Sequence, residues 1–74
     1  MTRAEHVHWA KDRAHEYLER GELLGAVVSM LNDLGKHPET LPVATNTFLA
    51  MVGTIDAMAH DERRVRRFID GFAE

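Results

Sequence analysis

The chain has 74 residues, of which 45% are apolar and 28% charged, and it carries a formal net charge of −3 with no cysteine. This composition excludes a disordered chain and a disulfide framework, and the acidic balance argues against nonspecific nucleic-acid binding by the whole molecule. The apolar stretches are shorter than the roughly 20 residues that span a bilayer, and the charged N-terminus lacks a signal peptide's apolar stretch. We therefore expect one soluble, intracellular domain over residues 1–74.

The first helix is predicted to begin after Thr2, because Thr2 and Glu5 are spaced as a capping box in which each side chain bonds a free backbone amide of the first turn. An apolar stripe at helical spacing follows it: Val7, Ala10, Ala14, Tyr17 and Leu18. Gly21 is expected to end this helix, since glycine adopts the left-handed conformation without steric cost.

Residues 22–34 predict a second, central helix. Eight apolar residues cover more than half of its circumference: Leu23, Leu24, Ala26, Val27, Val28, Met30, Leu31 and Leu34. A helix so apolar must contact neighbours on several sides. The remaining residues are expected to face water: Gly25, Ser29, Asn32 and Asp33.

A third helix is predicted to start at Thr40, with Pro42 in the first turn where its missing amide is tolerated. Its main stripe is expected to face the core: Ala44, Phe48, Met51, Val52, Ile55, Met58 and Ala59. A second face carries mostly small residues, which let another backbone approach closely: Asn46, Leu49, Ala50, Gly53 and Ala57. We assign Leu49, Gly53, Ala50 and Ala57 to self-association, with the Trp9 face of the first helix as the other candidate dimer surface. The alternative for Gly53 is a solvent-facing or kink-forming position.

A short fourth helix is predicted with Asp61 as its N-cap, closing one end of the fold with an apolar face of Val65, Phe68, Ile69 and Phe72. The predicted fold class is all-α: a compact bundle of three main helices plus a short C-terminal helix, with the first two helices as an antiparallel hairpin. A chain of this length buries only about 60% of its unfolded surface. Without a disulfide or a structural metal, a homodimer is the expected means of stabilisation.

Three segments of the chain resemble a family of small proteins that are encoded by bacteriophages of actinobacteria. The segments are WAKDRAHEY (residues 9–17), SMLNDLGKHPET (residues 29–40) and RRFIDGF (residues 66–72). The resemblance covers nearly the whole chain, and its middle segment is the most specific. It implies a phage origin and a host-cytoplasm setting, and it supplies no catalytic residue and no cofactor.

Trp9 lies off the apolar stripe of the first helix, with Arg13 one turn away and able to lie over the indole. An aromatic ring beside an arginine is typical of an interface hot spot, so Trp9, Arg13 and Glu16 are the expected protein-binding residues. The alternative is that the last helix folds back over Trp9 and makes it part of the core.

Arg63, Arg64, Arg66 and Arg67 form the one dense cluster of like charge. These arginines could meet phosphates or an acidic protein surface. A solvated structural face is the favoured interpretation, because Glu62 and Asp70 stand one turn from Arg66 and partly neutralise the cluster.

Four potential metal ligands share one face of the first helix: His8, Asp12, His15 and Glu19. The same residues form the polar face opposite the apolar stripe, and no other helix offers a histidine partner, so we expect no metal and no cofactor. No nucleophile stands beside a base, and no glycine-rich phosphate loop is present. The sequence therefore predicts a non-enzymatic phage protein that binds a host or phage protein, with a small nucleic-acid-binding accessory protein as the alternative.

Overall fold

The structure is a computed structural model that describes residues 2–44 and 46–73, without the side chains of residues 43, 44 and 47–49. All regular structure in these residues is helical: α1 (Arg3–Glu19), α2 (Leu23–Leu34), α3 (Leu41–Ala44), α4 (Thr47–Met58) and α5 (Glu62–Asp70). The radius of gyration is 11.1 Å, close to the ~11 Å of a compact folded chain of this length. The all-helical, compact prediction is confirmed. None of the described helices is long and apolar enough to cross a membrane.

Three helix ends, both ends of α1 and the start of α5, follow from the residues that cap them. The Glu5 amide donates to the Thr2 hydroxyl and the Thr2 amide donates to the Glu5 carboxylate, both at 3.1 Å, which confirms the capping box. The hydrogen bond from the Thr2 backbone lowers the pKa of Glu5. Gly21 has a φ of 76°, and Asp61 accepts a hydrogen bond from the Arg64 amide. The predicted start of α1, end of α1 and start of α5 are therefore confirmed.

Replacing the N-cap in Thr2→Ala should lower the free energy of unfolding by about 1 kcal/mol, because one amide of the first turn loses its acceptor. Denaturant unfolding followed by circular dichroism measures this change. Glu5→Gln is the matched control, since glutamine still accepts a hydrogen bond at this position, and its unfolding midpoint should stay near that of the parent. Equal midpoints for Thr2→Ala and the parent would contradict this assignment.

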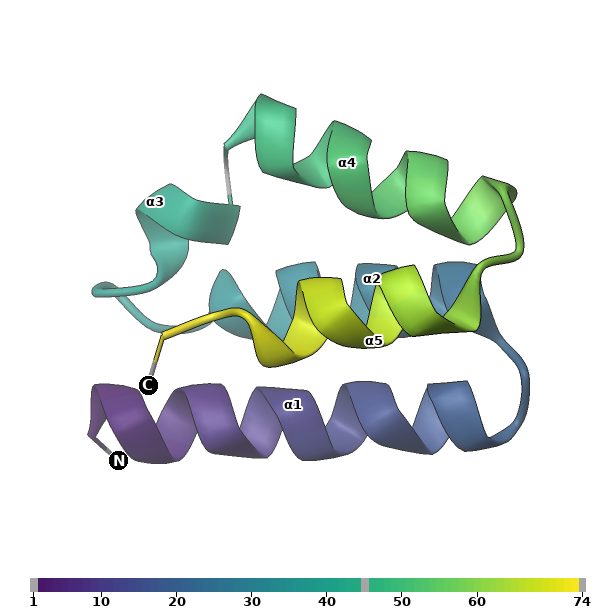
Figure 1. Cartoon of the computed structure of the whole chain (residues 1–74). Helices are drawn as coiled ribbons and strands as arrows, with labels where there is room; N and C mark the ends of the chain where they lie inside the picture. Colours follow the sequence, from purple (N-terminus) through teal and green to yellow (C-terminus); the bar gives the residue numbers. More distant parts are fainter. Residues whose placement is uncertain (1, 45, 74) are drawn as a thin grey trace.

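The core is built mainly between α1, α2 and α5. Its fully buried apolar side chains are Val7, Ala10, Ala14, Leu18, Ala26, Val27, Met30, Leu34, Ala57, Val65 and Ile69. Figure 1 shows α1 and α2 side by side, with α5 lying between α1 and α4, and α5 contacts α1, α2 and α4. The prediction that the last helix closes one end is therefore wrong. Val65 and Ile69 are completely buried, so one face of α5 belongs to the core, while its charged face is exposed.

The predicted third helix is interrupted. It appears as α3 and α4, with Thr45 outside the described residues and Asn46 outside both helices. The Asn46 carbonyl accepts the first backbone hydrogen bond of α4, from Ala50, and asparagine is a favoured residue at this position. Thr40, the expected start, is buried, and its hydroxyl donates to the Leu34 carbonyl at the end of α2.

Most of the small and polar residues of α2 that were predicted to face water face inward in the structure. Gly25, Ser29 and Asp33 follow one another at four-residue spacing, and they face inward instead of facing water. Ser29 and Asp33 are buried, and a Cβ on Gly25 would come within 2.9 Å of the Tyr17 ring. Only Asn32 is exposed as predicted. Small and polar residues thus pack α2 against α1, which leaves apolar residues of α2 half-exposed: Leu24 at 50% and Val28 at 49%.

Candidate functional site

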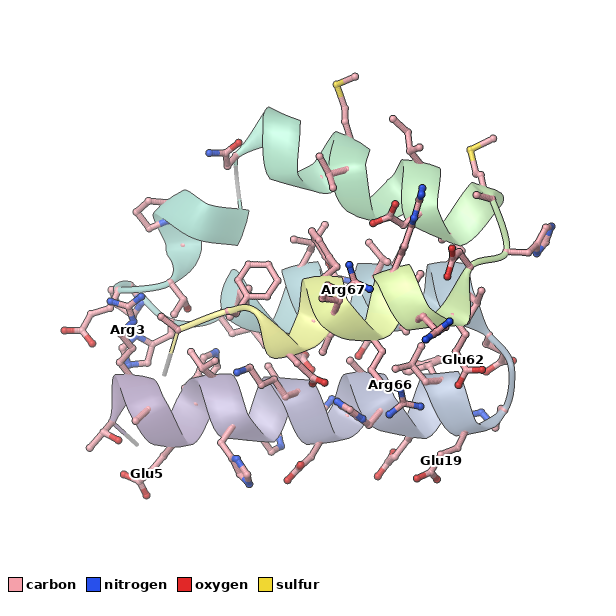
Figure 2. All side chains as sticks on the ribbon, viewed as in Figure 1. Arg3, Glu5, Glu19, Glu62, Arg66 and Arg67 are labelled. Atoms are coloured by element: carbon pink, nitrogen blue, oxygen red, sulfur yellow. The ribbon has the colours of Figure 1, made fainter. Side chains whose placement is uncertain are left out.

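The outward face of α4 is the largest departure from the sequence prediction. Met51, Ile55 and Met58, expected in the core, are 56%, 58% and 70% exposed. Figure 2 shows the sulfur-bearing side chains of α4 projecting away from the rest of the molecule. The three residues stand at i, i+4 and i+7, so they form one row along the helix, which we call the α4 ridge.

The small-residue face of α4 points inward instead. A Cβ on Gly53 would come within 2.8 Å of the Phe68 ring and 2.9 Å of Val27 Cγ1, and Ala57 is buried. The assignment of Gly53 and Ala57 to self-association is therefore wrong, because α2 and α5 of the same chain already occupy that face. A solvent-facing Gly53 is excluded for the same reason. The Leu49 side chain lies outside the described part of the structure.

A shallow groove runs beside the α4 ridge. Its lining residues are Ala50, Met51, Thr54 and Ile55. Ala50, the remaining residue of the expected self-association set, is half-buried at the edge of this groove. None of the described lining residues is charged, so the ridge and these residues together form a mostly apolar surface along one helix.

A second cluster surrounds Trp9, and we call it the Trp9 cluster. Its members are His6, Trp9, Arg13, Asp33, Lys36 and His37. The Arg13 guanidinium lies 5.0 Å and the Lys36 ammonium 5.6 Å from the centroid of the indole ring. The predicted stacking of Arg13 on Trp9 is confirmed. Trp9 is half-buried between these cations, and the residues that cover it come from α1 and from the segment after α2.

Asp33 holds the Trp9 cluster together. Its side chain is 1% exposed, and its two carboxylate oxygens accept hydrogen bonds from Arg13 Nε at 2.7 Å and Lys36 Nζ at 3.1 Å. His6 Nε2 lies 2.5 Å from the Asp33 carbonyl oxygen, so this nitrogen carries the proton and donates it. The arginine, the lysine and the indole are thus fixed by contacts within the chain. Glu16, the third residue expected at this surface, is exposed.

The arginines of α5 are divided between two sides of the helix. Arg66 points toward α1, where it bonds Glu62 at 3.1 Å and His15 at 3.3 Å, and Arg67 leaves α5 on another side (Figure 2). Arg64 pairs with Asp61 at 3.4 Å. Asp70 pairs with His15 and not with Arg66 as predicted. Half of the cluster is therefore neutralised, and its charges do not share one face.

The predicted polar face of α1 does not gather metal ligands. His15 turns toward Asp70 of α5, at 2.6 Å, and His8 pairs with Asp12 at 3.4 Å. Within residues 2–44 and 46–73, no three histidine or acidic side chains come together in a way that could hold a metal ion.

A hollow of about 270 Å³ lies where the start of α1 meets the segment after α5. Its lining is apolar apart from Arg3 and Thr40: Val7, Leu34, Gly71, Phe72 and Ala73 complete it. The Thr40 hydroxyl donates to the Leu34 carbonyl, so it is engaged in closing α2. Of the described residues that line this hollow, none is an acid, a general base or an activated nucleophile.

Comparison of the chain with protein-family models, with curated proteins and with solved structures gives no match.

The α4 ridge was missed by sequence reasoning because large apolar residues at helical spacing are typical of a core face. One signal was available: the opposite face of the same helix is also apolar, so the pattern alone does not decide which of the two faces the core.

Proposed function

We propose that this chain is a non-enzymatic protein-interaction module whose binding surface is the α4 ridge together with its groove. The observation that carries the proposal is the exposure of three large apolar side chains in one row of a packed helix. In the setting that the sequence resemblance implies, the protein is encoded by a phage and acts in the host cytoplasm, where it binds a host or phage protein.

Physical chemistry supports the α4 ridge as a contact surface. Exposed large apolar side chains that form a contiguous patch mark interaction sites more often than isolated ones do. Two of the three ridge residues, Met51 and Met58, have flexible, polarisable side chains that adapt to the shape of a partner. The Trp9 cluster supports the proposal less well, because Arg13 and Lys36 are already held by Asp33.

The proposal includes the arrangement of the helices. We infer that α1 and α2 form an antiparallel hairpin in a compact bundle, with α5 packed against both and α4 laid across α2 and α5. In that arrangement α4 is covered on one side only, and its ridge is available to a partner.

Affinity capture from a host lysate with the tagged chain tests the function. Ile55→Lys introduces a charge on the ridge and should abolish capture of the specific partner. Val28→Lys places the same charge at a half-exposed apolar position of α2 and should leave capture intact. A partner that binds Ile55→Lys as well as the parent would contradict the proposal.

The alternative, nucleic-acid binding by the α5 arginines, is separated by salt in the same experiment. Binding through phosphates weakens steeply between low and moderate salt, whereas apolar contacts persist. Arg63 and Arg67 form no ion pair with the described part of the chain, so Arg63→Ala with Arg67→Ala is the informative double variant. We expect this variant to capture the partner like the parent. The alternative would be favoured if the double variant captured no partner and if the parent lost its partner at moderate salt.

A further inference from the structure

We propose that a second copy of this chain occupies the α4 ridge and groove, giving a two-fold symmetric homodimer in which α4 crosses its counterpart. The inference rests on the proposed function and names the partner of that same surface. Self-association was predicted at the face of α4 that carries Gly53 and Ala57, which is buried within the chain. The proposed dimer uses the exposed face, the α4 ridge, instead.

The shape of the surface supports a second copy as the occupant. Met51 and Ile55 form a raised row four residues apart, and the groove between this row and the row of Ala50 and Thr54 lies directly beside it. Helices pack by placing rows of this spacing into grooves of the same spacing, at a crossing angle of about −50°. A two-fold axis near Ile55 would place the row of each copy in the groove of the other. Ridge and groove lie on the same few residues, as a self-complementary contact requires.

The charges around the surface also suit a second copy. Neither the ridge nor the described lining of the groove contains a charged residue, so these residues bring no like charges together at the centre of the contact. The edge of α4 that faces α5 has a hollow lined by Val52, Asp56, Arg64, Arg67 and Phe68. This edge carries charges of both signs. A second copy therefore meets at its rim a surface whose charges can complement its own.

The size of the surface predicts a weak dimer. The ridge exposes three large apolar side chains, at 56%, 58% and 70%, and the groove adds Ala50 and Thr54 beside them. A stable interface uses about 20–30 residues from each partner, many more than this surface offers, so we expect a weak dimer that forms only as the concentration rises.

Sedimentation equilibrium of the full chain from about 1 µM to 1 mM tests the proposal. The mass should rise from 8.4 kDa toward twice that value as the concentration increases. Ile55→Lys should weaken association at least tenfold, and Val28→Lys should dimerise like the parent. Circular dichroism confirms that both variants fold, which is expected because both positions are exposed. A parent that stays monomeric at every concentration, or a dimer that Ile55→Lys leaves unchanged, would overturn the proposal.

Disulfide cross-linking of single cysteine variants tests where the two copies touch, since the chain itself contains no cysteine. Thr54→Cys places a thiol in the groove near the proposed axis, and mild oxidation should convert it to a disulfide-linked dimer. Asn32→Cys, on the exposed side of α2, should cross-link at least tenfold more slowly. Equal rates for the two variants would count against the α4 contact. If the chain is monomeric but captures another protein in a way that depends on Ile55, the dimer is overturned and the proposed function stands. A dimer formed through Ile55 without any other captured protein supports this inference and overturns the wider function.

Discussion

Gly53→Val is expected to lower the free energy of unfolding by about 2 kcal/mol. The Cβ alone would lie 2.8 Å from the Phe68 ring and 2.9 Å from Val27, so α4 must move away from α2 and α5 or the ring must turn. Valine is only slightly better than glycine as a helix former, so its intrinsic preference offsets a small part of the loss. Chemical denaturation followed by circular dichroism measures the change.

The matched control for this prediction is Asn32→Val, which places the same side chain on an exposed position of α2. It should change stability by less than about 0.5 kcal/mol. If Gly53→Val were as stable as the parent, the close approach of α4 to Phe68 and Val27 would be wrong. The original interpretation of Gly53 as a surface position would then return.

Asp33→Ala is expected to cost about 3 kcal/mol of stability. The carboxylate is fully buried, and it accepts charge-assisted hydrogen bonds from Arg13 and Lys36. Removing one partner of a buried ion pair typically costs 3–5 kcal/mol, and the lower end applies here because the two cations are half-exposed and can regain water. Thermal and denaturant unfolding of the variant test this value.

Two further measurements distinguish the buried pair from a general effect of losing an aspartate. Asp12→Ala removes an exposed carboxylate that pairs with His8 and should change stability by less than about 0.5 kcal/mol. Arg13→Ala combined with Asp33→Ala should cost less than the sum of the two single changes, because the two residues share one interaction. Strict additivity would show that Arg13 and Asp33 act independently.

Local signals in the sequence were sufficient for both ends of α1 and for the start of α5. The capping box at Thr2, the glycine at position 21 and the aspartate at position 61 act within three or four residues of themselves. Their effects therefore do not depend on the rest of the fold. The same holds for Arg13 over Trp9, since both residues lie one turn apart on a single helix.

The orientation of α2 could not be predicted because apolar residues surround most of that helix. Sequence reasoning assigned its polar residues to water, whereas Asp33 is buried because Arg13, 20 residues away, and Lys36 supply the opposite charges. That pairing depends on how α1 packs on α2. A helical wheel of α2 alone contains no information about it.

The prediction of which face of α4 packs inward was wrong for a related reason. Large apolar residues on one face and small ones on the other are both compatible with burial, and the choice depends on the neighbouring helix. Phe68 of α5 fills the space next to Gly53, so the small face turns inward and the α4 ridge turns outward. The candidate site therefore became visible only once the position of α5 was known.

The most direct test of the outward α4 ridge is the reactivity of single cysteines in this cysteine-free chain, measured with a thiol reagent at low micromolar protein concentration. Ile55→Cys and Met58→Cys should react at rates close to those of an unfolded peptide. Ala57→Cys should react at least a hundredfold more slowly, since that position is buried against the rest of the chain. Fast labelling at position 57 together with slow labelling at position 55 would contradict the account.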